Sequence, residues 1–308
     1  MRFAGLRKLL ERSVVFAFTI SFLLLSAGCG THGNESSTSK YDAVYSNLVD
    51  TESQQILIAA LKNTDVPQTS IDVLIDSVTQ YNNAAGSVLP IQNGFDVFTE
   101  KSSSAYNADK LERKWEKTYR DLTGRRNCRI TAYEVMGSLI DYDISFKVAE
   151  PQLLVELNDS SVFQSTADID KFSVLFNGIE TAEDISADLQ AEQIIEYWKQ
   201  AGVSFPENNK IKLISVWFNG PDLYTDKDPY FLHCGHAAVL IHTESDEVLL
   251  LEKLDYNFPY QLIRFPSEAK ALQYIVEFYC GEINDEGILP VVFVNDKQLR
   301  LENDLFVY

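Results

Sequence analysis

The surroundings of Cys128 are those of a reactive thiol. Cys128 lies between Asn127 and Arg129, directly before an amphipathic stretch that predicts a helix beginning near residue 128. A cysteine at a helix N-terminus gains thiolate character from the helix dipole, and the nearby Arg126 and Arg129 would lower its pKa further. Free cysteine also occurs as a small core hydrophobe. The charged neighbours make a poor core environment, so we favour a reactive thiol.

A thiolate nucleophile normally works with a histidine and with a third group that orients the histidine. Three of the four histidines cluster in segment 233–242. His236 is the best candidate for the base, because it enters an apolar strand directly after a glycine. His233 is the alternative, and His242 is expected to be exposed beside a turn.

The strand after His236 is expected to form a hairpin that supplies the third residue. With the turn centred on Ser245, one register places His236 opposite Leu254 and the other places it opposite Glu252. Both registers keep His236 and Glu252 on the same face, so Glu252 is the predicted orienting carboxylate. Asp255, just past the strand, is the alternative.

The same residues allow other interpretations. Glu252 could form a strand-edge ion pair with Lys253 or a neighbouring residue, since a buried carboxylate needs a partner. A zinc site is a further alternative, although residues 234 and 236 share a face of a strand from which residue 233 points away. Its ligands would come from four residues of the two types that zinc prefers, namely His233, Cys234, His236 and Cys280.

The first 29 residues predict export and lipid attachment. Residues 1–28 combine a basic start, an apolar run at 14–25 and small residues at 26–28, which is the layout of a signal peptide, and the small residues running into Cys29 look like a bacterial lipobox. We expect Cys29 to be lipidated and 29–40 to be a flexible tether, which places the protein on the outer face of the cytoplasmic membrane. An uncleaved membrane anchor is the alternative. In that compartment Cys234 and Cys280 could form a disulfide.

The remaining pattern predicts an α+β fold. Residues 41–125 are helical in pattern, another helix covers 180–201, and the last third turns to strands interrupted by a helix at 268–279. The predicted strands are 211–218, 237–242, 248–254 and 290–294. We therefore expect one domain, 41–308, with helices first and then a mainly antiparallel sheet. The net charge of −19 leaves no basic surface for nucleic acid.

Two resemblances follow from these residues. The order of Cys128 at a helix start, His236 opening a strand and an acidic residue on the next strand resembles the papain-like cysteine hydrolases, including the NlpC/P60 peptidases. That resemblance implies a helix-on-sheet core in which Cys128 attacks a carbonyl, His236 moves the proton and Glu252 orients the ring. Asn127 and Arg129 would support the site, with the Cys128 N–H in the oxyanion hole.

The second resemblance covers most of the chain. Segments 45–50, 127–131, 236–240, 252–254 and 259–261 are similar to an uncharacterised family of Firmicutes lipoproteins, known as domain of unknown function 4300. It implies a compact, lipid-anchored protein of a Gram-positive cell envelope.

Together these patterns predict a cysteine peptidase or amidase that needs no cofactor and no metal and acts on peptide or peptidoglycan amide bonds. The alternative is a non-catalytic surface lipoprotein that captures a ligand or protein partner. Its binding groove would be lined by aromatic residues, namely Trp217, Phe218, Tyr224, Tyr230, Phe258 and Tyr260.

Overall fold

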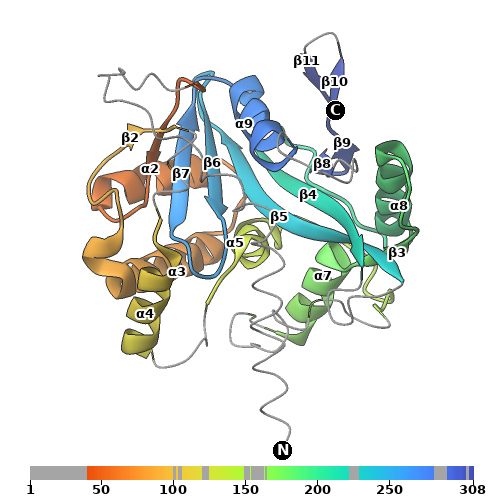
Figure 1. Cartoon of the computed structure of the whole chain (residues 1–308), viewed down its shortest axis with the longest axis horizontal. Coiled ribbons are helices and arrows are strands. Elements are labelled where there is room, and N and C mark those ends of the chain that lie inside the picture. Colours follow the sequence, from red (N-terminus) through yellow and green to blue (C-terminus); the bar gives the residue numbers. More distant parts are fainter. Residues whose placement is uncertain are drawn as a thin grey trace, which may run out of the picture.

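The protein has an α+β fold, as its sequence predicts (Figure 1). The computed structural model describes residues 40–99, 102, 106–119, 125–148, 153, 163, 165–221, 229–280, 290–302 and 305–308. The expected signal peptide, the lipidated Cys29 and its tether lie outside the described residues. None of the described helices combines the length and apolar content needed to cross a bilayer.

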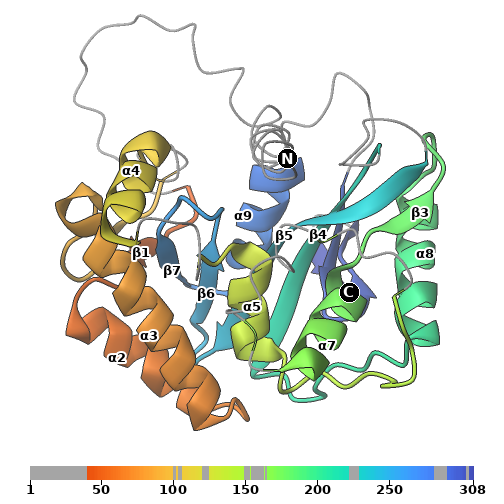
Figure 2. The same ribbon diagram turned by 90° about the horizontal axis from the view of Figure 1, so that it is seen from below.

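Seven α-helices are present in the described part of the chain. They are α2 (Thr51–Lys62), α3 (Gln68–Ala85), α4 (Ala108–Tyr119), α5 (Cys128–Met136), α7 (Thr166–Phe176), α8 (Ala187–Gln200) and α9 (Glu268–Cys280). Figures 1 and 2 show α2, α3 and α4 grouped at one end of the sheet, α7 and α8 at the other, and α5 between the two groups.

Nine strands form one antiparallel sheet, ordered β2-β1-β7-β6-β5-β4-β8-β9, with β3 paired to β5 beside this path. The long central strands are β4 (Ile211–Pro221) and β5 (Tyr230–His242). The others are β1 (Val44–Ser46), β2 (Asp96–Val97), β3 (Ile179–Thr181), β6 (Val248–Lys253), β7 (Tyr260–Phe265), β8 (Val291–Val294) and β9 (Lys297–Gln298). A separate hairpin joins β10 (Arg300–Glu302) to β11 (Leu305–Val307).

The sequence prediction misses some elements. The region predicted as wholly helical, 41–125, also contains β1 and β2, which extend the sheet beyond β7. These strands have only three and two residues, too few to show an alternating pattern. β7 and α7 were not predicted, although Ser165 and Asp168 form a capping pattern at the start of α7. The helix predicted at 180–201 begins only at Ala187 because β3 precedes it.

The hairpin between β5 and β6 adopts one of the two expected registers. Val239 pairs with Leu251 and His242 with Val248, so continuing the ladder sets His236 opposite Leu254. Glu252 is then a diagonal neighbour of His236 on the same face, within reach of a long side chain.

A β-bulge lies next to His236. In the ladder with β4, His236 pairs with Val216 and Cys234 pairs with Trp217, so Gly235 is left without a direct partner. A Cβ atom at Gly235 would lie 2.5 Å from the Phe218 ring. The close approach of this ring therefore requires glycine here, and the bulge sets the direction in which β5 presents His236.

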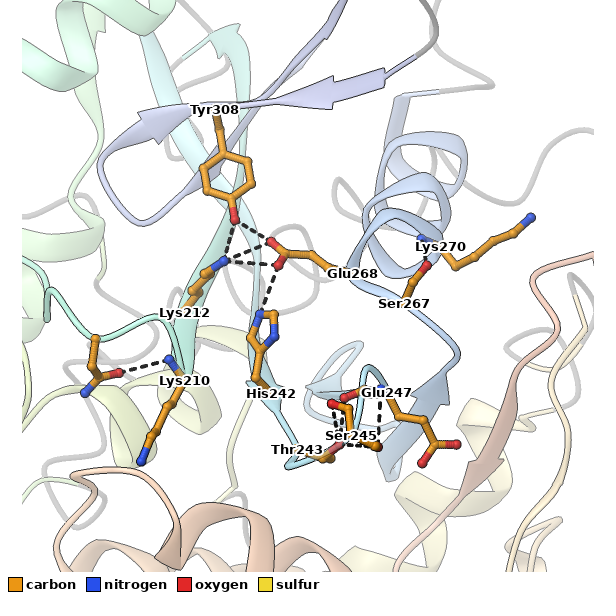
Figure 3. Close-up of polar contacts among 11 residues, drawn as sticks. Lys210, Lys212, His242, Thr243, Ser245, Glu247, Ser267, Glu268, Lys270 and Tyr308 are labelled. Atoms are coloured by element: carbon orange, nitrogen blue, oxygen red, sulfur yellow. Dashed lines mark hydrogen bonds and ion pairs between the residues drawn. The ribbon is translucent and has the colours of Figure 1, made fainter.

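At the other end of these strands, four side chains tie the sheet to α9 and to the C-terminal hairpin (Figure 3). Lys212 Nζ contacts both carboxylate oxygens of Glu268 at 3.1 Å, and His242 Nε2 lies 2.9 Å from Glu268 Oε2. The Tyr308 hydroxyl donates to Glu268 Oε1 at 2.5 Å. Partial burial on its own raises the pKa of Glu268, but the hydrogen bonds from His242, Tyr308 and Lys212 outweigh it and lower the pKa to about 2.

This lowered pKa predicts a pH-dependent stability. Because the pKa of Glu268 in the folded state lies below its ordinary value of 4.5, its contribution is complete above pH 4.5 and is lost as the pH falls toward 2. We expect the loss of unfolding free energy between pH 6 and pH 3, measured by urea denaturation, to be smaller in Glu268→Gln by about 2 kcal/mol. In the control Glu247→Gln, which removes a partly exposed ion pair with Arg264, the loss should match that of the wild type. Equal pH dependence in wild type and Glu268→Gln would contradict the assignment.

Candidate active site

The start of α5 fixes the position of Cys128. Asn127 is the N-cap residue, and its Oδ1 accepts a hydrogen bond from the Ile130 N–H at 2.9 Å. Cys128 is therefore the first helical residue, where backbone N–H groups without intrahelical partners create positive potential. Cys128 is only 4% exposed.

The bulged part of β5 brings His236 to this helix end. Cys128 Sγ lies 3.8 Å from the carbonyl oxygen of Gly235, and its interaction with the neighbouring His236 side chain lowers the pKa of the Cys128 thiol. His236 is 1% exposed. The sequence separation of these two residues is large, so their contact depends on the packing of α5 against β5.

Glu252 lies on the other side of the imidazole. Its Oε2 is 3.0 Å from His236 Nε2, and its Oε1 accepts hydrogen bonds of 2.8 Å from Gln261 Nε2 and from the Tyr274 hydroxyl. Glu252 has no exposed surface, so these three donors replace water. Because Nε2 faces Glu252, Nδ1 is the ring nitrogen left for Cys128.

The electrostatics of the pair favour charge separation. Burial on its own raises the pKa of the Cys128 thiol, but the hydrogen bond with His236 and the charges of His236 and Arg129 lower it, and the net direction is downward. Burial on its own lowers the pKa of His236, but the hydrogen bonds to Cys128 and Glu252 raise it to about 9. At neutral pH the arrangement therefore favours a thiolate beside an imidazolium.

A buried chain of hydrogen bonds orients Gln261, the residue that donates to Glu252. The Tyr106 hydroxyl donates to Gln261 Oε1 at 2.6 Å, and Asn47 Nδ2 donates to the Tyr106 hydroxyl at 2.9 Å. Asn47 Oδ1 in turn accepts from the Ile91 N–H at 3.1 Å. The amide of Gln261 is thus oriented so that its NH2 group faces the carboxylate of Glu252.

These supporting residues are absent from the sequence prediction. Gln261 had a usable signal, because a glutamine inside an apolar strand and directly opposite Glu252 in the β6–β7 ladder needs a polar partner. Tyr106 and Asn47 had none, since they come from distant segments. Tyr279 of α9 was also missed, and its ring stacks on His236 with centroids 4.4 Å apart and an interplanar angle of 21°.

The other predicted site residues are Arg129, Asn127, His233 and Asp255, and each has a different contact. Arg129 Nη1 donates to the Cys234 carbonyl at 2.8 Å, and its charge acts on Cys128 as expected. Asn127 uses Oδ1 as the helix cap. His233 Nε2 lies 3.3 Å from the carbonyl oxygen of Pro221, and Asp255 Oδ1 accepts from the Tyr256 N–H at 2.6 Å. Neither alternative forms a described contact with Cys128.

Lys253 does not pair with Glu252. Its Nζ is buried and donates to three backbone carbonyls of the β6–β7 loop, those of Asp255, Tyr256 and Phe258, at 2.8, 2.9 and 2.6 Å. The ammonium lies 4.4 Å from the centre of the Tyr81 ring. Burial lowers the pKa of Lys253 well below its ordinary value. Lys253 therefore shapes the loop that follows Glu252, and the ion pair considered between Lys253 and Glu252 is not formed.

The disulfide considered for Cys234 and Cys280 is not formed, because both are free thiols together with Cys128. Cys234 is buried and its Sγ lies 3.3 Å from the His236 carbonyl oxygen. Cys280 is partly buried, and burial raises its pKa to about 11. Within the described residues, no group of three or more His, Cys, Asp or Glu side chains could hold a metal ion.

Three of the six residues expected to line an aromatic groove do not lie at the surface. Trp217, Phe258 and Tyr260 are buried in the core, where they pack rather than line a surface. Tyr224 lies outside the described residues.

The fold and this centre define a class: an α+β protein with a buried cysteine beside a buried histidine that is hydrogen-bonded to a buried glutamate. The chain belongs to the family described as Domain of unknown function (DUF4300), whose model matches residues 44–299. Searches of curated proteins and of solved structures each gave no significant match. The matched range contains Cys128, His236, Glu252 and every residue that supports them.

The geometry predicts how the thiol responds to Glu252. Replacing Glu252 with Gln removes the negative charge that stabilises the imidazolium, so Cys128 should lose thiolate character. We expect its alkylation by iodoacetamide, followed by peptide mass spectrometry between pH 5 and pH 9, to slow about tenfold at pH 6. Tyr274→Phe, which removes one donor to Glu252 without a change of charge, should leave Cys128 reactive at pH 6.

The matched control is Glu277→Gln, which removes a carboxylate from α9 where it contacts Lys40 and Tyr41. Its alkylation profile should equal that of the wild type. Identical profiles for wild type and Glu252→Gln would show that Glu252 does not act on Cys128 through His236.

Proposed function

We propose that this chain is a cysteine hydrolase of amide bonds, with Cys128 as nucleophile, His236 as proton carrier and Glu252 as orienting carboxylate. The observation that carries the proposal is the position of His236, whose Nε2 is held 3.0 Å from Glu252 Oε2 and which directly follows Gly235, the residue whose carbonyl oxygen lies 3.8 Å from Cys128 Sγ. Thiol nucleophiles work with a histidine base and a third group that orients the histidine, and papain-like hydrolases have these three residues in the same order along the chain.

The reaction follows from the positions of these atoms. Cys128 Sγ attacks the carbonyl carbon of the amide, and the carbonyl oxygen becomes an oxyanion. The C–N bond then breaks as His236 gives its proton to the leaving amine, which leaves a thioester on Cys128. Water attacks the thioester while His236 takes its proton, and the carboxylic acid departs as the thiolate forms again.

The helix start supplies the expected oxyanion site. The Cys128 N–H is at the positive end of α5, where it can donate to an oxygen bound next to Sγ. Asn127 contributes by holding this first turn, since its Oδ1 caps the helix at the Ile130 N–H. Arg129 adds positive charge beside the thiolate.

Substitution of the nucleophile tests the activity. With peptides and purified peptidoglycan fragments as substrates, and new termini detected by mass spectrometry, Cys128→Ala and His236→Ala should each lower turnover by at least about 10³-fold. Cys234→Ala, which removes a buried thiol on the same strand, is the control and should retain activity. Equal turnover by wild type and Cys128→Ala would contradict the proposal. A thioester adduct on Cys128, trapped by acid quench, would support it.

We also propose that the chain is anchored by lipid on the outer face of the cytoplasmic membrane, next to the cell wall. This rests on the sequence alone: a basic start, an apolar run and small residues before Cys29. The full chain has a net charge of −19, and residues 1–28 contain four of its basic residues, so the body gains no attraction from an anionic membrane and lipid would have to retain it.

Lipidation is testable by itself. In a Gram-positive host fed labelled palmitate, the wild-type chain should carry label and sediment with membranes. Cys29→Ala should carry no label, and less of the protein should sediment. Label that persists in Cys29→Ala would place the lipid elsewhere.

A further inference from the structure

Side chains of β3 and α8 line a groove. Figures 1 and 2 show these two elements at the end of the sheet that lies away from α2 and α3. The volume of the groove is about 430 Å³. Both apolar and acidic side chains line it, among them Ile179, Glu180, Leu189, Glu192, Glu196 and Tyr197. Leu189 is 50% exposed, so an apolar side chain is presented to whatever occupies the groove.

The charge of the groove is negative and largely uncompensated. Glu196 accepts from Gln200 at 3.0 Å and lies 3.9 Å from Lys199. Within the described part of the chain, no basic side chain pairs with Glu180 or Glu192. The groove therefore complements positive charge.

One side of the groove is a strand with an open edge. β3 pairs with β5 through Ile179–Leu232, Glu180–Phe231 and Thr181–Tyr230, and no other described strand pairs with it. An extended peptide can add to such an edge through main-chain hydrogen bonds.

The spacing of the acidic residues fits an extended chain. Glu192 and Glu196 are one helical turn apart on α8, so their Cβ atoms are separated by roughly 6 Å. Side chains two residues apart on an extended strand are separated by roughly 7 Å and point to the same side. Basic residues at alternate positions of a peptide would therefore meet Glu192 and Glu196 in turn.

The β3–β5 register relates the groove to Cys128. Continuing the ladder from the Ile179–Leu232 pair places Cys234 and Gly235 two and three residues farther along β5. The Gly235 carbonyl contacts Cys128 Sγ. At about 3.4 Å per residue, the positions of β5 that pair with β3 are three to five residues, or roughly 10–17 Å, from Gly235 along the strand.

We infer that the groove between β3 and α8 binds an extended peptide with basic side chains at alternate positions, as the part of the substrate three to five residues from the bond that Cys128 cleaves. The inference rests on the proposed hydrolase function for the role of the peptide, and on the groove itself for its binding.

Binding is best measured without turnover, in the full chain carrying Cys128→Ser. The probe is a fluorescein-labelled eight-residue peptide of Thr and Val that contains Lys-Thr-Lys, followed by fluorescence anisotropy. Reversing the groove charge with Glu192→Lys and Glu196→Lys together should weaken binding at least about tenfold. The matched control replaces Glu244 and Asp246 with Lys at the exposed β5–β6 turn. The affinity of this control for the peptide should stay within twofold of that of the parent chain.

Two altered peptides separate strand addition from charge attraction. A peptide with Glu in place of both Lys should not bind, and one with N-methylated backbone at alternate residues should bind at least about tenfold more weakly. Equal weakening in the groove and turn variants, or undiminished binding of either altered peptide, would overturn the inference.

Cleavage of the same peptide by the wild-type chain keeps the two proposals distinguishable. Groove-dependent binding with cleavage supports both. Groove-dependent binding without cleavage of any peptide supports the peptide site but contradicts the hydrolase. Cleavage of peptides that is insensitive to Glu192→Lys and Glu196→Lys supports the hydrolase and overturns the assignment of the groove.

Discussion

The buried carboxylate of Glu252 is the constraint on which the rest of the site depends. A carboxylate with no exposed surface is costly unless its oxygens are satisfied, and here His236, Gln261 and Tyr274 satisfy them. These donors come from β5, β7 and α9, so the strand order and the packing of α9 on the sheet are both required. The charge of Glu252 in turn keeps His236 protonated, and the protonated ring stabilises the Cys128 thiolate.

Local features of the backbone position the side chains of Cys128 and His236. The Asn127 cap begins α5 at Cys128, and the bulge at Gly235 sets the direction of His236 on β5. The stacked ring of Tyr279 fixes the imidazole plane. The same enclosure that excludes water and strengthens the ion pair also leaves only 4% of Cys128 exposed, so the approach to the thiol is narrow.

The sequence is informative where the signals are local. Asn127 before an amphipathic run marks the helix start, and alternation along β5 and β6 places His236 and Glu252 on one face whichever register forms. The actual register could not be chosen from the pattern, because both options bury the same apolar residues. Gln261 could have been predicted, because a glutamine inside an apolar strand needs a polar partner. Tyr274, Tyr279 and Tyr106 enter the site only through tertiary packing. The pairing of Cys234 with Cys280 could not be judged from the sequence for the same reason, since spacing along a chain does not give the distance between two elements.

The central claim is that Cys128 and His236 form an ion pair in the resting protein. Its most direct test is the titration of the His236 ring by NMR of isotopically labelled histidine between pH 5 and pH 10. The structure predicts that the ring titrates near pH 9, and that the midpoint falls when Cys128 is replaced by Ala, because the partner charge is removed. A His236 ring that titrates near its ordinary value of 6.5 in the wild-type chain would contradict the ion pair and the nucleophile built on it.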